Sequence, residues 1–163
     1  MSDLPQVHPT VVHMLAEAAR QVPEREALVC QGERLSYAQY LRCVAWFADE
    51  LVALGARDKR VGIVLGNSLD ICIAMFAIHA AGAQAVPCNP LYTARELRDI
   101  FADADIHVLI HADDKREMIA PIATELGIPQ CIAIGEAARR LTAWRDGADR
   151  PLPQPLPRPE QLA

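Results

Sequence analysis

The first candidates for chemistry are Gly66, Asn67 and Ser68, which lie between a predicted strand and a predicted helix. Free backbone amides and the helix dipole at such a point can hold a phosphate group. The glycines Gly62 and Gly66 match neither a dinucleotide-binding loop nor a P-loop. Asn and Ser both favour the N-cap position of a helix. The sequence therefore favours a capping role for Asn67 or Ser68 over a phosphate site.

Two histidines and two aspartates form a second group of candidate ligands, with His107 and His111 ahead of Asp113 and Asp114. Imidazoles and carboxylates can bind a metal ion together. On a strand, however, residues four positions apart have Cα atoms about 13 Å apart, which is too far for one ion. We therefore expect surface histidines and a helix cap from Asp113 or Asp114, and we assign no metal site.

Isolated residues could also supply an acid–base group or a cation. His79 lies in an apolar segment with no acidic or nucleophilic neighbour, which favours a core or interface histidine. The two lysines, Lys59 and Lys115, lack the glycine-rich context of a phosphate-binding lysine, so we expect solvated loop residues. The sequence gives no reason to assign a catalytic or cofactor-binding residue.

Cysteine use argues against a disulfide framework or a zinc site. The chain has five cysteines, an odd number without a Cys-x-x-Cys pair, at Cys30, Cys43, Cys72, Cys88 and Cys131. Most lie in apolar runs, so we expect free thiols that pack as small hydrophobic side chains. A reactive thiol needs an electropositive neighbour, and only Cys43, next to Arg42, has one in the sequence.

Alternating strand and helix patterns must position these residues. The pattern predicts helices at 11–21, 37–54, 69–81, 94–104 and 115–126, and strands at 60–65, 84–86, 106–110 and 130–134. A short β-hairpin at 27–35, with Gly32 in its turn, precedes them. This order predicts a three-layer α/β fold, in which a mostly parallel sheet carries helices on both faces.

Local chemistry fixes two of the helix starts. Ser36 with Gln39, and Thr93 with Glu96, have the spacing of a reciprocal capping box. The second box follows a stiff connector, because the prolines at 87 and 90 fix φ and keep the residues before them extended.

Composition limits the partners and the location. The net charge is −5 with a pI of about 5.5, so no basic field exists to hold nucleic acid or an anionic membrane. The longest apolar stretch, 69–86, is interrupted by Asp70, His79 and Gln84, which argues against a transmembrane segment. Residues 1–4 lack the features of a signal peptide, so we expect a cytoplasmic protein. An apolar share of 52% predicts a face that packs against another surface, with self-association as one outcome.

The chain divides into two parts. Residues 1–145 carry the strand and helix pattern, and residues 146–163 have proline at every second position from Pro151 to Pro159. We expect a proline-rich linker or tail there. A proline-rich ligand is disfavoured because this spacing supplies no Pro-x-x-Pro.

Three motifs in order carry a family resemblance. They are Leu-Ser-Tyr-Ala-Gln-Tyr at 35–40, Val-Gly-Ile-Val-Leu-Gly-Asn-Ser at 61–68, and Ala-Gly-Ala-Gln-Ala-Val-Pro-Cys-Asn-Pro at 81–90. From about residue 27 to about residue 110 the chain resembles the N-terminal region of the AMP-forming acyl-CoA synthetases, within the acyl-adenylate-forming family. The run Asn-Pro-Leu-Tyr-Thr-x-x-Glu-Leu at 89–97 is most similar to the fatty acyl-CoA ligase branch.

The resemblance implies a parent enzyme that activates a fatty or other hydrophobic carboxylic acid. Such an enzyme uses ATP and magnesium to form an acyl-adenylate, then transfers the acyl group to coenzyme A. Members bind ATP on a Ser/Thr/Gly-rich loop ending in Pro-Lys-Gly, and these 163 residues contain no such loop. We therefore expect an N-terminal part of the large domain that is not catalytically competent alone, with the remainder of the synthetase as its partner.

Two other classes compete with this interpretation. A stand-alone, non-catalytic α/β binding or dimerisation module would share the architecture. A phosphoacceptor signalling domain would need an aspartate at the end of a central strand. The strand ends at Leu65-Gly66-Asn67 and Val86-Pro87-Cys88 offer none, so this last class is the least favoured.

Overall fold

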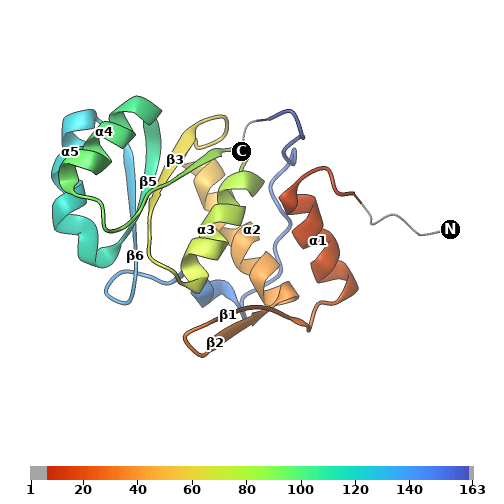
Figure 1. Cartoon of the computed structure of the whole chain (residues 1–163). Coiled ribbons are helices and arrows are strands. Elements are labelled where there is room, and N and C mark those ends of the chain that lie inside the picture. Colours follow the sequence, from red (N-terminus) through yellow and green to blue (C-terminus); the bar gives the residue numbers. More distant parts are fainter. Residues whose placement is uncertain (1–6, 162–163) are drawn as a thin grey trace.

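The structure is a computed structural model that describes residues 7–161. An N-terminal helix and a β-hairpin precede a run of alternating strands and helices (Figure 1). The prediction for residues 1–4, that they are not a signal peptide, lies outside the described residues. No helix within residues 7–161 combines the length and the apolar character that crossing a membrane requires.

A four-stranded parallel sheet lies at the centre of the fold. Its strands stand in the order β4-β3-β5-β6 and span Arg60–Val64 (β3), Gln84–Pro87 (β4), Ile106–Ala112 (β5) and Gln130–Ile134 (β6). Strand β3 is buried from Val61 onward, as expected for a parallel strand that is covered on both faces. Its side chains alternate between two cores, with Ile63 on one face and Val64 on the other.

Helices cover both faces of this sheet, which confirms the predicted three-layer α/β class (Figure 1). Helices α2 (Tyr37–Ala53) and α3 (Leu69–Ala80) pack on one face, and α4 (Ala94–Ala104) and α5 (Arg116–Leu126) pack on the other. Helix α1 (Val11–Gln21) lies outside α2 and contacts both α2 and α3. The larger core lies between the sheet and the α2–α3 layer.

The predicted hairpin is present as β1 (Glu26–Cys30) and β2 (Glu33–Ser36). Gln31 and Gly32 form its turn with φ of 49° and 85°. Two consecutive positive φ values are typical of the turn that suits the right-handed twist of paired strands, and glycine adopts them without steric cost.

The capping boxes formed as predicted. The Ser36 hydroxyl accepts from the Gln39 amide, and the Thr93 hydroxyl accepts from the Glu96 amide, each with the reciprocal side-chain bond. Thr10 differs, because its hydroxyl pairs with the His13 ring at 2.8 Å and caps no backbone amide of α1.

Residues 146–161 form no helix or strand, and they pack back onto the domain. The Trp46 indole donates to the Ala148 carbonyl at 3.0 Å, and Arg42 binds the Asp149 carboxylate at 2.7 Å. Further on, Leu152 and Leu156 pack against the larger core. In Figure 1 this blue segment runs between α1 and the α2–α3 pair.

Candidate functional site

The carboxyl ends of the parallel strands form the natural crevice of this sheet. From β3 the chain passes through α3 to β4, then through α4 to β5 on the other side of β3. Open α/β sheets bind ligands at such a reversal of strand order. Here the reversal holds a cavity of about 250 Å³, lined mainly by the β3–α3 loop, the end of β5 and the segment after β6.

The loop between β3 and α3 forms one wall of this crevice. Ser68 is the N-cap of α3, and its hydroxyl accepts from the Ile71 amide at 3.3 Å, which confirms the predicted capping role. The backbone carbonyl of Asn67 accepts a hydrogen bond from the Cys30 thiol at 3.9 Å. The loop therefore uses its polar groups to start the helix and to hold the hairpin.

A charge network that the sequence analysis missed contributes Asp70 and Arg140 to the lining of the crevice. Asp70 is only 4% exposed, and its carboxylate accepts from the Leu141 amide at 2.6 Å and from the Arg140 guanidinium at 2.5 Å. Arg140 also binds Glu33 of the hairpin at 2.8 Å, and this hydrogen bond lowers the pKa of Glu33. The network ties α3, the hairpin and the segment after β6 together. An acidic residue in the first turn of a mostly apolar helix was the signal that could have found it.

Asp113 contributes to the same crevice in an unpredicted way. The expectation that Asp113 or Asp114 caps a helix is wrong, because residues 113–115 form a short 3₁₀ turn and Lys115 precedes α5 without a side-chain cap. The Asp113 carboxylate accepts from the Ala137 amide at 2.7 Å instead. It also packs over Gly135, where an added Cβ would lie 2.2 Å from the Asp113 carboxyl carbon. Asp113 therefore fixes the turn after β6.

The expectation of two surface histidines is wrong for His111. Strand β5 continues to Ala112, beyond the predicted end at 110, because Ala112 still pairs with Ile134 of β6. His111 consequently lies in an interior strand and is 4% exposed, with its Nδ1 atom 2.7 Å from the Ala112 carbonyl. His107 is half-buried. Both histidines belong to the same strand, so the spacing argument against a shared ion applies.

The other isolated candidates lie apart from the crevice. His79 is half-buried near the end of α3, and burial lowers the pKa of its ring. It borders a cavity that is also lined by Pro157 and Pro159, so it lies at the interface between α3 and the proline-rich segment. Lys59 is exposed in the loop before β3, while Lys115 is half-buried after β5. The structure does not bring either lysine to the lining of the crevice.

The cysteines divide by burial. Cys43 and Cys88 are buried, Cys30 and Cys72 are half-buried, and Cys131 is exposed, which corrects the expectation of burial for that residue. Burial raises the pKa of Cys43 to about 12, so the neighbouring arginine does not make this thiol reactive.

Two hydrogen bonds hold the connector after β4. The Cys88 amide donates to the Ile63 carbonyl at 2.8 Å, and the Asn89 side chain accepts from the Leu91 amide at 2.9 Å. Leu91 is left 85% exposed at the tip.

These contacts limit what the crevice can do chemically. Asp70 and Glu33 are paired with Arg140 and Arg145, and the Asp113 carboxylate is engaged by a backbone amide. Within residues 7–161 no group of three or more His, Cys, Asp or Glu side chains is arranged to hold a metal ion. The arrangement suits a rigid support for a site better than a catalytic centre. That this chain supplies no catalytic, cofactor-binding or metal-binding residue stays a prediction.

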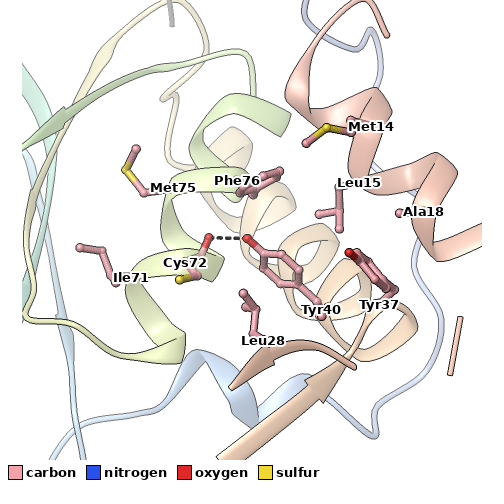
Figure 2. Close-up of a pocket in the computed structure, with 11 residues that line it drawn as sticks. Met14, Leu15, Ala18, Leu28, Tyr37, Tyr40, Ile71, Cys72, Met75 and Phe76 are labelled. Atoms are coloured by element: carbon pink, nitrogen blue, oxygen red, sulfur yellow. Dashed lines mark hydrogen bonds between the residues drawn. The ribbon is translucent and has the colours of Figure 1, made fainter. Parts of the chain in front are cut away.

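A separate apolar groove shares no lining residue with the crevice. Helices α1, α2 and α3 and strand β1 surround a cavity of about 520 Å³ (Figure 2). The Tyr40 hydroxyl donates to the Cys72 carbonyl at 2.9 Å, and its ring meets Phe76 edge to face at 5.4 Å. Burial raises the pKa of the Tyr40 phenol well above its ordinary value.

Comparison with known proteins decides the family. The model of the family described as AMP-binding enzyme matches residues 15–163. The chain belongs to this family. A relative from Mycobacterium tuberculosis, a medium/long-chain fatty acid–CoA and 3-oxocholest-4-en-26-oate–CoA ligase, is 33% identical over 113 residues. That match covers 69% of this chain and 21% of the relative, so the chain spans about a fifth of the length of the curated relatives it matches.

Solved structures agree with the family. An inhibitor-bound N-terminal domain of FACL13 from Mycobacterium tuberculosis superposes with a TM-score of 0.78 at 26% identity, over 91% of this chain and 38% of that one. The anthranilate CoA ligase AuaEII in complex with anthranoyl-AMP gives a TM-score of 0.81 over 98% of this chain and 31% of that one. Its 23% identity supports the fold alone. The family resemblance predicted from the motifs is thus confirmed.

Proposed function

We propose that this chain is the N-terminal part of the large domain of an AMP-forming acyl-CoA ligase. The observation that carries the proposal is the family match over residues 15–163, together with relatives that are CoA ligases. Residues 1–145 would form the structural unit, and residues 146–163 a proline-rich tail. The packing of Leu152 and Leu156 on the core supports a tail that stays with this unit.

In this proposal the chain positions a catalytic site without supplying its reactive groups. ATP, magnesium and coenzyme A would be bound by the parent enzyme and would supply adenylation and thioester chemistry. The crevice residues of this chain would hold the carboxyl edge of the sheet in one shape. Asp70 locks the segment after β6 to α3, and Asp113 fixes the turn at Gly135. A sheet edge held by paired charges costs little reorganisation when substrate binds beside it.

The names of the relatives support a proposal for the substrate class. The Mycobacterium tuberculosis relative is a ligase of fatty acids and of a sterol-derived acid, which are both hydrophobic carboxylic acids. We propose a fatty or other hydrophobic carboxylic acid for the parent of this chain, and the cytoplasm as its location. A stand-alone binding or dimerisation module is the alternative, and the apolar groove beside α1 favours it as a second candidate.

The test is an assay of the polypeptide encoded by the complete reading frame that contains these residues. With ATP, magnesium, coenzyme A and a fatty acid, it should form AMP and acyl-CoA in equal amounts. The 163-residue chain alone, as the matched control, should form neither. A reading frame without a Pro-Lys-Gly loop, or a complete protein that forms no AMP with any hydrophobic acid, would support the binding-module alternative.

A further inference from the structure

Two of the five cysteines, Cys30 and Cys72, lie on elements that touch each other. Cys30 is the last residue of β1, Cys72 lies in the first half of α3, and these two elements are in contact. Both side chains are half-buried and pack against the larger core. The other three are placed differently, because Cys43 is buried in α2, Cys88 packs in the smaller core and Cys131 is exposed on β6.

Strand geometry directs the Cys30 side chain toward α3. Successive side chains of a strand point to opposite faces, so Cys30 and Leu28 share one face of β1. Leu28 lines the apolar groove together with Ile71 and Cys72 of α3 (Figure 2). The Cys30 thiol donates to the Asn67 carbonyl at 3.9 Å, and Asn67 directly precedes the N-cap of α3. The Cys30 thiol therefore lies beside the start of α3.

Helix geometry directs the Cys72 side chain toward the same place. Cys72 follows the N-cap residue Ser68 by four positions, so the two residues lie on one face of α3, one turn apart. Side chains of a helix tilt toward its N-terminus and cover the preceding turn. The Cys72 thiol is thus directed to the turn beside which the Cys30 thiol lies. Burial, and next the Cys30 thiol itself, raise the pKa of Cys72, as two neighbouring sulfur atoms require.

We propose that Cys30 and Cys72 form a reversible disulfide when the folded chain meets hydrogen peroxide. The peroxide transfers one oxygen atom to the Cys30 sulfur, which becomes a sulfenic acid, and one water molecule is released. The Cys72 sulfur then attacks the Cys30 sulfur and displaces hydroxide, which takes up the Cys72 proton and leaves as a second water molecule. Two thiols are oxidised and one peroxide is reduced. A thiol reductant restores both cysteines by disulfide exchange.

This disulfide would connect two walls of the crevice. Gln31 follows Cys30 in the hairpin turn and lines the crevice together with Asn67 and Ser68. A bond from Cys30 to α3 therefore holds the hairpin turn against the β3–α3 loop. Disulfides of cytoplasmic proteins are usually transient and redox-sensing, and a bond formed by peroxide and removed by thiols is of this kind. Both cysteines belong to this chain, so the bond forms whether or not the parent is a ligase.

Mapping of the thiols after mild oxidation tests the proposal. The Cys131→Ser chain, which lacks the exposed thiol, is treated with hydrogen peroxide, and the remaining thiols are blocked with iodoacetamide. Trypsin releases Cys30 in one peptide and Cys72 in another, which also contains Cys88 because no Lys or Arg separates the two. Cys30→Ser and Cys72→Ser are therefore compared with Cys88→Ala, the matched control in the shared peptide. The same oxidation is repeated in urea, where the chain is unfolded.

The proposal predicts one link within the folded chain. Mass spectrometry should show the Cys30 peptide joined to the peptide of Cys72, and the intact chain should lose two hydrogen atoms. Cys30→Ser and Cys72→Ser should abolish the link, Cys88→Ala should keep it, and dithiothreitol should remove it. The oxidised chain should have a Tm higher by about 5 °C or more, because the bond closes a loop of about 40 residues in the unfolded chain. The yield of this link should be lower in urea, where all thiols compete.

Four results would overturn the proposal. Sulfenic or sulfinic acid at Cys30 without a link would show that the two sulfur atoms do not meet. A link that Cys88→Ala abolishes and Cys72→Ser keeps would contradict the placement of Cys30 beside α3. A disulfide found only between chains, as a dimer on a non-reducing gel, would assign the thiols to association. An equal yield in the folded chain and in urea would show that the native contacts do not direct the pairing.

Discussion

Replacing Asp70 by alanine should destabilise the chain strongly, because this carboxylate joins α3 to the segment after β6. The Leu141 amide lies 2.6 Å from one carboxylate oxygen and the Arg140 guanidinium 2.5 Å from the other. Asp70 is 4% exposed and Leu141 is fully buried, so water cannot replace the lost acceptor for the Leu141 amide.

The expected magnitude follows from these two contacts. Leaving a buried amide without an acceptor costs about 1–3 kcal/mol. The Arg140 contact adds about 1 kcal/mol, at the upper end of the range for exposed ion pairs, because the Asp70 side chain is buried while the arginine side chain is 30% exposed and keeps its bond to Glu33. We expect a loss of about 3 kcal/mol, which corresponds to a fall in Tm of about 6–12 °C for a domain of this size.

Urea unfolding followed by tryptophan fluorescence measures this loss, since Trp144 lies in the same 3₁₀ turn as Leu141. Asp70→Asn keeps an acceptor for the amide and should cost about half as much as Asp70→Ala. Glu17→Ala removes an exposed ion pair with Arg20 and should leave the midpoint unchanged. A midpoint for Asp70→Ala equal to that of Glu17→Ala would refute the reasoning that the network holds the crevice.

Three further predictions address a helix cap, a histidine and the thiols. Thr93→Ala should cost about 1 kcal/mol in urea unfolding, because it removes the capping box of α4. Thr124→Ala, at an exposed threonine within α5, should cost far less. Equal losses would show that the cap contributes nothing. Burial lowers the pKa of His79, so the unfolded chain binds this proton at higher pH than the folded chain does. The free energy of unfolding should therefore decrease as the pH is lowered from about 7.5 to about 5.5, by at most about 1.4 kcal/mol per pH unit. His79→Gln should flatten this slope, and an unchanged slope would contradict the assignment to His79. A thiol reagent should label Cys131 in the folded chain, and Cys43 only after unfolding. Mass spectrometry of the digested protein measures both reactions. Labelling of Cys43 in the folded chain would contradict its burial.

Local chemistry made most of the fold predictable from the sequence. The capping boxes at Ser36 and Thr93 depend on residues three positions apart, so their spacing alone identified two helix starts. The hairpin turn at Gly32 was also predictable, because it depends on neighbouring residues only. The order of strands and helices then limited the architecture to a parallel sheet that is covered on both faces.

Features that depend on distant residues were not predictable in this way. Strand β5 extends to Ala112 because β6 offers it a partner, and this pairing buries His111. Asp113 binds the amide of Ala137, so it was not free to cap a helix. The Asp70 network joins residues about seventy positions apart, which no local pattern reveals. Local rules thus located the elements, and tertiary pairing decided which polar side chains meet.

We propose above all that this chain belongs to an enzyme that adenylates a hydrophobic carboxylic acid. The most direct measurement is AMP formation by the polypeptide encoded by the complete reading frame, with a fatty acid, ATP, magnesium and coenzyme A. We expect one AMP for each acyl-CoA formed, and no product from the 163-residue chain. Acyl-CoA formation by the 163-residue chain alone, or a folded complete polypeptide that forms no AMP, would contradict it.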